Sequence, residues 1–207
     1  MELNIRPILI SSTGSARYGY NLKKSDQDFM ILAEMEDRYI NDKETGIDYF
    51  VVSLTTFRNF WGHPLRLADL VNDCTGNERL CAFLKKHRWE IPYAAPGRTA
   101  LYGLEYIAQG ENSGFDSTIK PSLRTAIVLD HMSKRADNPF LLSEEEKIIL
   151  TRARTGGVPP EERVEIYRRT ISPENINRLL KMPDHPTIKN ELFQLIDDII
   201  SKEEFAC

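Results

Sequence analysis

Three short apolar runs, each about the length of a β-strand, lie within the first 53 residues of this 207-residue chain. They cover residues 6–10, 28–33 and 46–53, and charged or turn-forming residues separate them. Because the connection between the second and third runs is short, we expect these two strands to be antiparallel neighbours. Residues 37–43 then form a charged connection between them. The pattern predicts a small β-sheet at the start of the chain.

After the third run, apolar residues recur at helical spacing as far as the C-terminus. Ser143 is followed three residues later by Glu146, which is the capping-box pattern at the start of a helix. Proline and glycine interrupt the chain between residues 92 and 97. We therefore predict an α/β (α+β) fold. A small mixed sheet containing antiparallel pairs, with its helices, occupies residues 1–92, and a mostly α-helical domain occupies residues 93–207.

Composition excludes several classes of function. The net charge of −4 argues against a general polyanion-binding protein but leaves room for a local basic groove. The three cysteines include no C-x-x-C pair, and the four histidines lack metal-site spacing, so neither a disulfide framework nor a zinc site is expected. No apolar run approaches the roughly 20 residues of a membrane span. We expect a cytoplasmic protein with no membrane partner.

Two aspartates lie at the start of the second apolar run. Asp26 and Asp28 are separated by one residue, so in a strand their side chains would point to the same face. A third carboxylate, Asp48, lies within the next predicted strand, where burial is costly unless the charge is paired or coordinated. Oxygen ligands without nearby Cys or His favour Mg²⁺ or Mn²⁺. The pattern predicts a divalent-metal site built from Asp26, Asp28 and Asp48.

A small-residue turn follows the first predicted strand. Gly14 and Ser15 would begin a short helix over residues 14–20, whose backbone N–H groups and serine hydroxyl suit a phosphate. Nucleotidyl transfer from a nucleoside triphosphate (NTP) requires hydrogen-bond donors that hold phosphate on one side of a cleft and metal-binding carboxylates on the other.

These residues resemble a known superfamily, and the resemblance covers roughly residues 8–53. The motif consists of Gly14-Ser15, Tyr18-Gly19, Ser25-Asp26-x-Asp28 and the later Asp48. It resembles the DNA polymerase beta-type nucleotidyltransferases, and most of all their small predicted-nucleotidyltransferase branch from bacteria and phages. The resemblance implies that Gly14 and Ser15 contact the triphosphate and that the three carboxylates bind two magnesium ions. It also implies that a basic helix bearing Lys120 and Arg124 faces the phosphates.

The predicted reaction transfers a nucleoside monophosphate from an NTP to a hydroxyl group and releases pyrophosphate. Asp26 and Asp28 bind metal, and Asp48 binds metal and assists deprotonation. The acceptor is open between RNA or tRNA ends, a protein side chain and a small molecule, and the oligomeric state is also open. The alternative is a non-catalytic nucleotide-binding or antitoxin-type regulatory protein that keeps the same fold.

Overall fold

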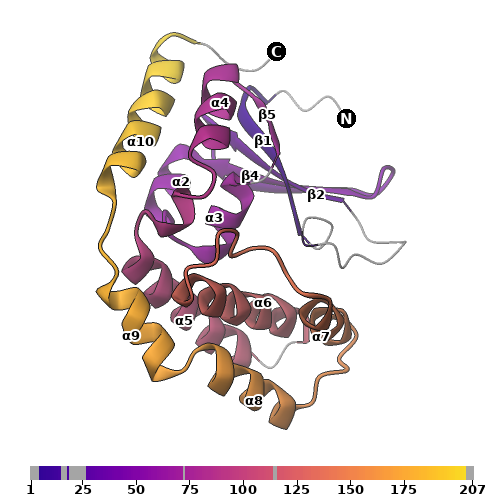
Figure 1. Ribbon diagram of the computed structural model, residues 1–207. Coiled ribbons are helices and arrows are strands. Elements are labelled where there is room, and N and C mark those ends of the chain that lie inside the picture. The colour runs from indigo at the N-terminus through magenta and orange to yellow at the C-terminus, as the bar shows by residue number, and fades with distance from the viewer. Residues whose placement is uncertain (1–4, 15–17, 19–26, 72, 114–115, 204–207) are drawn as a thin grey trace.

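The computed structural model of the chain describes residues 5–14, 18, 27–71, 73–113 and 116–203 (Figure 1). Its strands are β1 (Pro7–Thr13), β2 (Gln27–Ala33), β3 (Arg38–Asp42), β4 (Ile47–Ser53) and β5 (Cys74–Gly76). The helices of the described residues are α2 (Leu54–Asn59), α3 (Pro64–Leu70), α4 (Glu78–Lys86), α5 (Pro96–Asn112), α6 (Asp116–Ser133), α7 (Glu144–Arg154), α8 (Pro160–Thr170), α9 (Pro173–Lys181) and α10 (Pro186–Ser201), with one 3-10 turn, η1 (Ile91–Tyr93). The predicted combination of a mixed sheet with many helices is confirmed.

The five strands form one sheet in the order β3-β4-β2-β1-β5. β2 and β4 are parallel, and the other neighbouring strands are antiparallel. The prediction that the second and third apolar runs are antiparallel neighbours is therefore wrong. Residues 38–42, predicted as a connection, form the edge strand β3, and β4 enters the sheet between β3 and β2. The polar residues of β3 suit an edge strand, because one side of an edge strand faces water.

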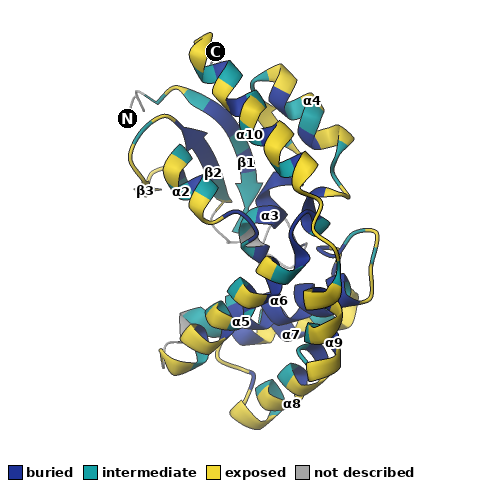
Figure 2. Cartoon of the chain, turned by 90° about the vertical axis from the view of Figure 1, so that its left-hand side faces the viewer, coloured by how far each residue is buried: buried dark blue, intermediate teal, exposed yellow. Residues whose placement is uncertain are grey.

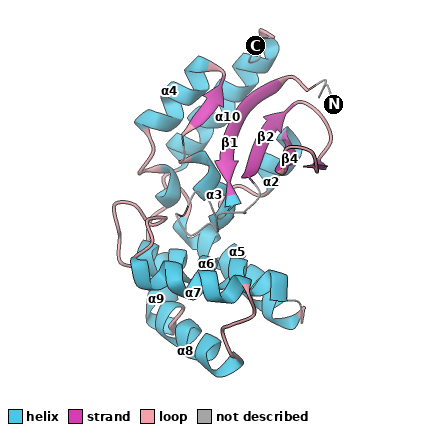
Figure 3. Ribbon diagram, turned by 90° about the vertical axis from the view of Figure 1, so that its right-hand side faces the viewer, coloured by secondary structure: helices cyan, strands magenta, loops and turns pink. Residues whose placement is uncertain are grey.

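Helices lie against the sheet and beyond one end of it. In Figure 3 the sheet occupies the upper part of the molecule, and α5 to α9 form a layer below it. α2, α3, α4 and the C-terminal helix α10 lie beside the sheet, and α10 runs next to α4 in Figures 1 and 2. The helices that follow residue 93 are thus found in two places. α5 to α9 form the lower layer, and α10 returns to the upper part.

Aromatic packing and ion pairs hold α10 in this position. The Phe193 ring lies edge-on to Phe57 and Trp61, with centroid separations of 6.0 and 5.6 Å. Arg79 Nη2 on α4 lies 2.5 Å from Asp198 Oδ2. Exposed ion pairs contribute little to stability, so we attribute the docking of α10 mainly to the buried aromatic contacts.

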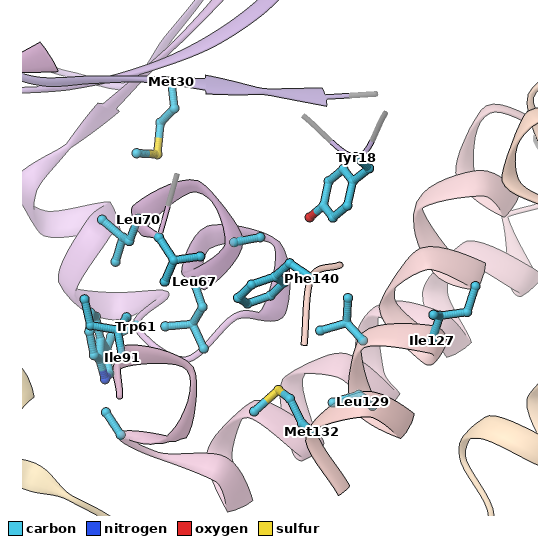
Figure 4. Close-up of a cluster of buried hydrophobic side chains, with 14 of the residues drawn as sticks. Tyr18, Met30, Trp61, Leu67, Leu70, Ile91, Ile127, Leu129, Met132 and Phe140 are labelled. Atoms are coloured by element: carbon cyan, nitrogen blue, oxygen red, sulfur yellow. The ribbon is translucent and has the colours of Figure 1, made fainter. Parts of the chain in front are cut away.

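A continuous hydrophobic core joins the two parts of the molecule. Figure 4 shows Met30 of β2 and Trp61 on the sheet side, with Phe140 between them and Ile127 of α6. α5 and α6 pack closely at Gly103, which has no Cβ. A Cβ at this position would lie only 2.7 Å from a methyl carbon of Leu129. This contact joins α5 to α6, and both helices lie below the sheet in Figure 3.

The predicted capping box begins α7. The Glu146 backbone N–H donates to Ser143 Oγ at 3.2 Å, and the Ser143 backbone N–H donates to Glu146 Oε2 at 2.7 Å. Among the helices of the described residues, none combines the length and apolar character needed to cross a membrane.

Candidate functional site

A row of polar residues crosses four strands at the end of the sheet nearest to α5 and α6. Asp28 of β2 is paired in register with Asp48 of β4, and the row continues to Thr13 of β1 and Asn41 of β3. Residues directly paired on neighbouring strands have their Cβ atoms about 5 Å apart on the same face. The prediction that Asp48 lies in the strand adjacent to Asp28 is confirmed. This register places Asp28 and Asp48 side by side on neighbouring strands.

The backbone of Gly14 lies directly against the Asp28 side chain. Gly14 follows β1 and has a φ of +71°, a conformation that favours glycine. A Cβ at this position would lie 1.8 Å from Asp28 Oδ2 and 2.7 Å from Asp28 Cγ. Only glycine therefore permits this approach. Gly14, predicted to contact phosphate, adjoins a predicted metal ligand.

Two of the predicted site residues, Asp26 and Ser15, lie outside the described residues. Their predicted roles in metal and phosphate binding remain predictions. Within the described part of the chain, no group of three or more His, Cys, Asp or Glu side chains is arranged to hold a metal ion. The pair Asp28 and Asp48 is the part of the predicted metal site that the structure brings together.

Neighbours on the edge strand β3 hold the Asp48 carboxylate. Asn41 Nδ2 donates to Asp48 Oδ1 at 2.6 Å. A hydrogen bond to Asp48 raises the pKa of the Tyr39 hydroxyl. These contacts fix the carboxylate beside Asp28 and leave it oxygen lone pairs for a cation.

A cavity of about 550 Å³, which we call the central pocket, opens between this end of the sheet and α5 and α6. Its lining residues are Thr13, Gly14, Asp28, Phe50, Thr56, Phe60, His63, Arg66, Asp69, Tyr102, Glu105, Tyr106, Gln109, Pro121 and Arg124. Small-molecule sites generally have volumes of roughly 300–1,000 Å³. The central pocket is therefore large enough for a nucleotide-sized molecule.

α6 brings positive charge to the central pocket. Arg124 is 7% exposed, lines the pocket, and lies over the Tyr18 ring with 4.6 Å between its Cζ atom and the ring centroid. Lys120 lies one helical turn earlier and is half-buried. Burial lowers the pKa of Lys120 to about 8, and the positive charges of Arg124 and Arg154 act in the same direction. The Asp28 carboxylate opposes this shift. The two predicted phosphate-binding residues thus lie on the same helix, and both are electrostatically linked to the site.

The central pocket also contains residues that the sequence analysis did not single out. His63, just before α3, has its pKa lowered to about 4 by burial and by the nearby charges of Arg66 and Arg124. The Arg66 guanidinium forms an ion pair with the buried Asp69 carboxylate at 3.4 Å. In the sequence, these residues belong only to the polar side of a short amphipathic helix and the residue just before it. That pattern is common to most surface helices.

Comparison of the chain with protein-family models, with curated proteins and with solved structures finds no match. The site must therefore be interpreted from its own geometry and from the motif.

Proposed function

We propose that this protein is a divalent-metal-dependent nucleotidyltransferase that moves a nucleoside monophosphate from an NTP to a hydroxyl acceptor. One observation carries the proposal. Asp28 and Asp48 lie in register at the end of the sheet, and Asp28 lines a pocket that Arg124 also lines. Paired carboxylates and a facing cation are what a metal-bound polyphosphate requires, since the metal and the arginine both bind phosphate oxygens.

The donor set fits Mg²⁺ or Mn²⁺. Both ions prefer oxygen ligands, and Mg²⁺ is commonly held by one or two carboxylates together with substrate phosphates and water. Asp28 and Asp48 supply two carboxylates, and Asp26, if it shares their face of the strand, would supply a third. A bound ion would neutralise charge that develops on the reacting phosphate and the leaving group.

The chain's own residues would bind, orient and deprotonate the substrates. Arg124 and Lys120 would hold phosphate oxygens, with Gly14 providing close backbone approach on the opposite side. The acceptor oxygen attacks the α-phosphorus, and the bond from that phosphorus to the oxygen bridging to the β-phosphorus breaks. Pyrophosphate leaves with that oxygen and its electron pair. The acceptor proton passes to the Asp48 carboxylate, directly or through water, and from there to solvent.

An experiment with carboxylate variants tests this proposal. The parent, Asp28→Asn, Asp48→Asn and the control Glu34→Gln are each incubated with Mg²⁺ and α-labelled NTPs. Total RNA, protein and small hydroxyl compounds are offered as acceptors. Glu34 follows the opposite end of β2 and is exposed, so its variant should retain parental activity.

We expect Mg²⁺-dependent label transfer and pyrophosphate release that fall at least about 10³-fold in both aspartate variants, because metal-dependent charge stabilisation contributes several kcal/mol. Transfer at the parental rate by Asp28→Asn would contradict the proposal. Tight, metal-dependent NTP binding without transfer to any acceptor would favour the non-catalytic alternative.

A further inference from the structure

Two chemically different sets of residues line the central pocket. One set carries charge or a backbone amide and includes Asp28, Gly14 and Arg124, and the other consists of aromatic rings that include Phe50 and Phe60. A nucleotide has the same division, with an anionic polyphosphate at one end and a flat, uncharged heterocycle at the other. The central pocket therefore offers suitable contacts to both parts of a nucleotide and not to its phosphates alone.

One face of α5 contributes two aromatic rings and two polar side chains to the central pocket. Tyr102, Glu105, Tyr106 and Gln109 recur at positions i, i+3, i+4 and i+7, which is the spacing of a single helical face. All four line the central pocket, and we call them the α5 face. Helical residues at such positions usually serve packing. Here the face combines two aromatic rings with a carboxylate and an amide that open onto a cavity.

The ring of Tyr102 is held in place before any ligand binds. Its hydroxyl donates to the Asn59 carbonyl oxygen at 3.0 Å and accepts from Arg98 Nη2 at 2.8 Å. The Arg98 guanidinium also lies over the ring, with its Cζ atom 5.1 Å from the centroid. A ring fixed in this way loses little side-chain entropy when a flat ligand stacks on it.

His63 packs next to both tyrosines of the α5 face. Its ring centroid lies 5.1 Å from that of Tyr106, edge-on, and 6.3 Å from that of Tyr102. Because burial and the neighbouring arginines keep the pKa near 4, the imidazole is neutral at physiological pH. A neutral imidazole offers no ion pair to a phosphate, so His63 suits an uncharged heterocycle better than a phosphate.

We propose that His63 and the α5 face form a subsite for the base of the NTP, with the ring of Tyr106 as its main stacking surface. This inference rests on the proposed function, because it places the polyphosphate at Asp28 and Arg124. It adds that the protein selects a nucleotide over other polyphosphates through aromatic contacts and an uncharged histidine. A ring belonging to the acceptor is the competing occupant of the same surface.

A binding experiment with two probes separates the charged residues of the pocket from its rings. Inorganic tripolyphosphate with Mg²⁺ reports on the charged residues alone, and each of the four NTPs with Mg²⁺ reports on both sets. Affinities are measured by calorimetry for the parent, Tyr106→Ala, His63→Ala and the conservative Tyr106→Phe. Leu101→Ala is the matched control, because Leu101 lies on α5, is 59% exposed and does not line the pocket. If thermal unfolding shows that Tyr106→Ala is not folded, Tyr106→Leu replaces it, because leucine keeps more of the side-chain volume.

We expect the parent to bind at least one NTP more tightly than tripolyphosphate. Loss of the Tyr106 ring should weaken NTP binding roughly 5- to 150-fold, the range in which base–aromatic stacking falls, and leave tripolyphosphate binding unchanged. Tyr106→Phe and Leu101→Ala should resemble the parent. If Tyr106→Ala or Tyr106→Leu bound NTP as tightly as the parent, the inference would be overturned while the proposed function stands. The same conclusion would follow if the only effect were a higher KM for the acceptor. A parent protein that binds neither probe would contradict the proposed function itself.

Discussion

Replacing Gly14 with alanine tests whether its close approach to Asp28 matters for metal and phosphate binding. Two effects are expected from the geometry. Alanine at a φ of +71° adopts the left-handed conformation, which costs about 1–2 kcal/mol. In addition, the new methyl carbon would lie 1.8 Å from Asp28 Oδ2, so the carboxylate must move away from its position beside Asp48.

A second glycine separates these two effects. Gly156 has a nearly identical φ of +72° but lies at the exposed end of α7. Gly156→Ala should therefore carry the backbone cost alone and lose about 1–2 kcal/mol of unfolding free energy, and Gly14→Ala should lose at least as much. For a chain of this length that loss corresponds to a Tm lower by about 2–8 °C.

Only Gly14→Ala should also lose metal-dependent NTP binding, because only there is Asp28 displaced. Thermal unfolding with EDTA, with Mg²⁺, and with Mg²⁺ plus NTP measures both quantities, since a ligand that binds only the folded state raises Tm. If Gly14→Ala showed the same Mg²⁺- and NTP-dependent rise in Tm as Gly156→Ala, the close approach of Gly14 to Asp28 would have no part in ligand binding.

Three further predictions concern the fold around the site. Lowering the pH from 7.5 to 5 should reduce the unfolding free energy of the parent by about 2 kcal/mol more than it reduces that of His63→Gln, as measured by urea titration. The reason is that His63 is protonated near pH 6.5 in the unfolded chain but only near pH 4 in the folded protein. Equal losses in the two proteins would show that His63 is not held neutral. Ser143→Ala should lower the unfolding free energy by about 1 kcal/mol because it breaks the α7 capping box, and Glu145→Ala in the same turn should not match it. Phe193→Ala should cost up to about 3 kcal/mol in the same assay, because the partly buried ring packs on Phe57 and Trp61; a change below about 0.5 kcal/mol would mean that α10 is not docked by this ring.

Local patterns predicted the strands that carry the carboxylates but not the order in which they pair. The apolar runs that became β1, β2 and β4 were recognisable because each has the length and composition of a buried strand. β3 was missed because Arg38, Asn41 and Asp42 are polar, as suits an exposed edge. With β3 treated as a connection, an antiparallel pairing of the two longer strands was the natural inference. The parallel pairing follows from the insertion of β4 between β3 and β2.

The site was only partly predictable for a related reason. Asp28, Asp48 and Gly14 lie close together in the first 48 residues, so spacing and motif were enough to indicate them. His63 and the α5 face reach the pocket only through the packing of α3, α5 and α6, to which no short-range pattern points. Arg124 was indicated by the motif resemblance alone. Its burial beside Tyr18 depends on contacts between residues more than 100 positions apart in the sequence.

The shared metal site of Asp28 and Asp48 is most directly tested with Mn²⁺, which is paramagnetic. Electron paramagnetic resonance measures how much Mn²⁺ the protein binds in the presence of a non-hydrolysable NTP analogue, and the coupling to phosphorus-31 shows whether the bound ion also contacts phosphate. The parent and Glu34→Gln should bind Mn²⁺ with such a coupling. Asp28→Asn and Asp48→Asn should each weaken binding at least about tenfold, because either change removes a charged ligand. Mn²⁺ binding of equal strength in all four proteins, or no binding by the parent, would contradict the assignment of these two aspartates to a metal site.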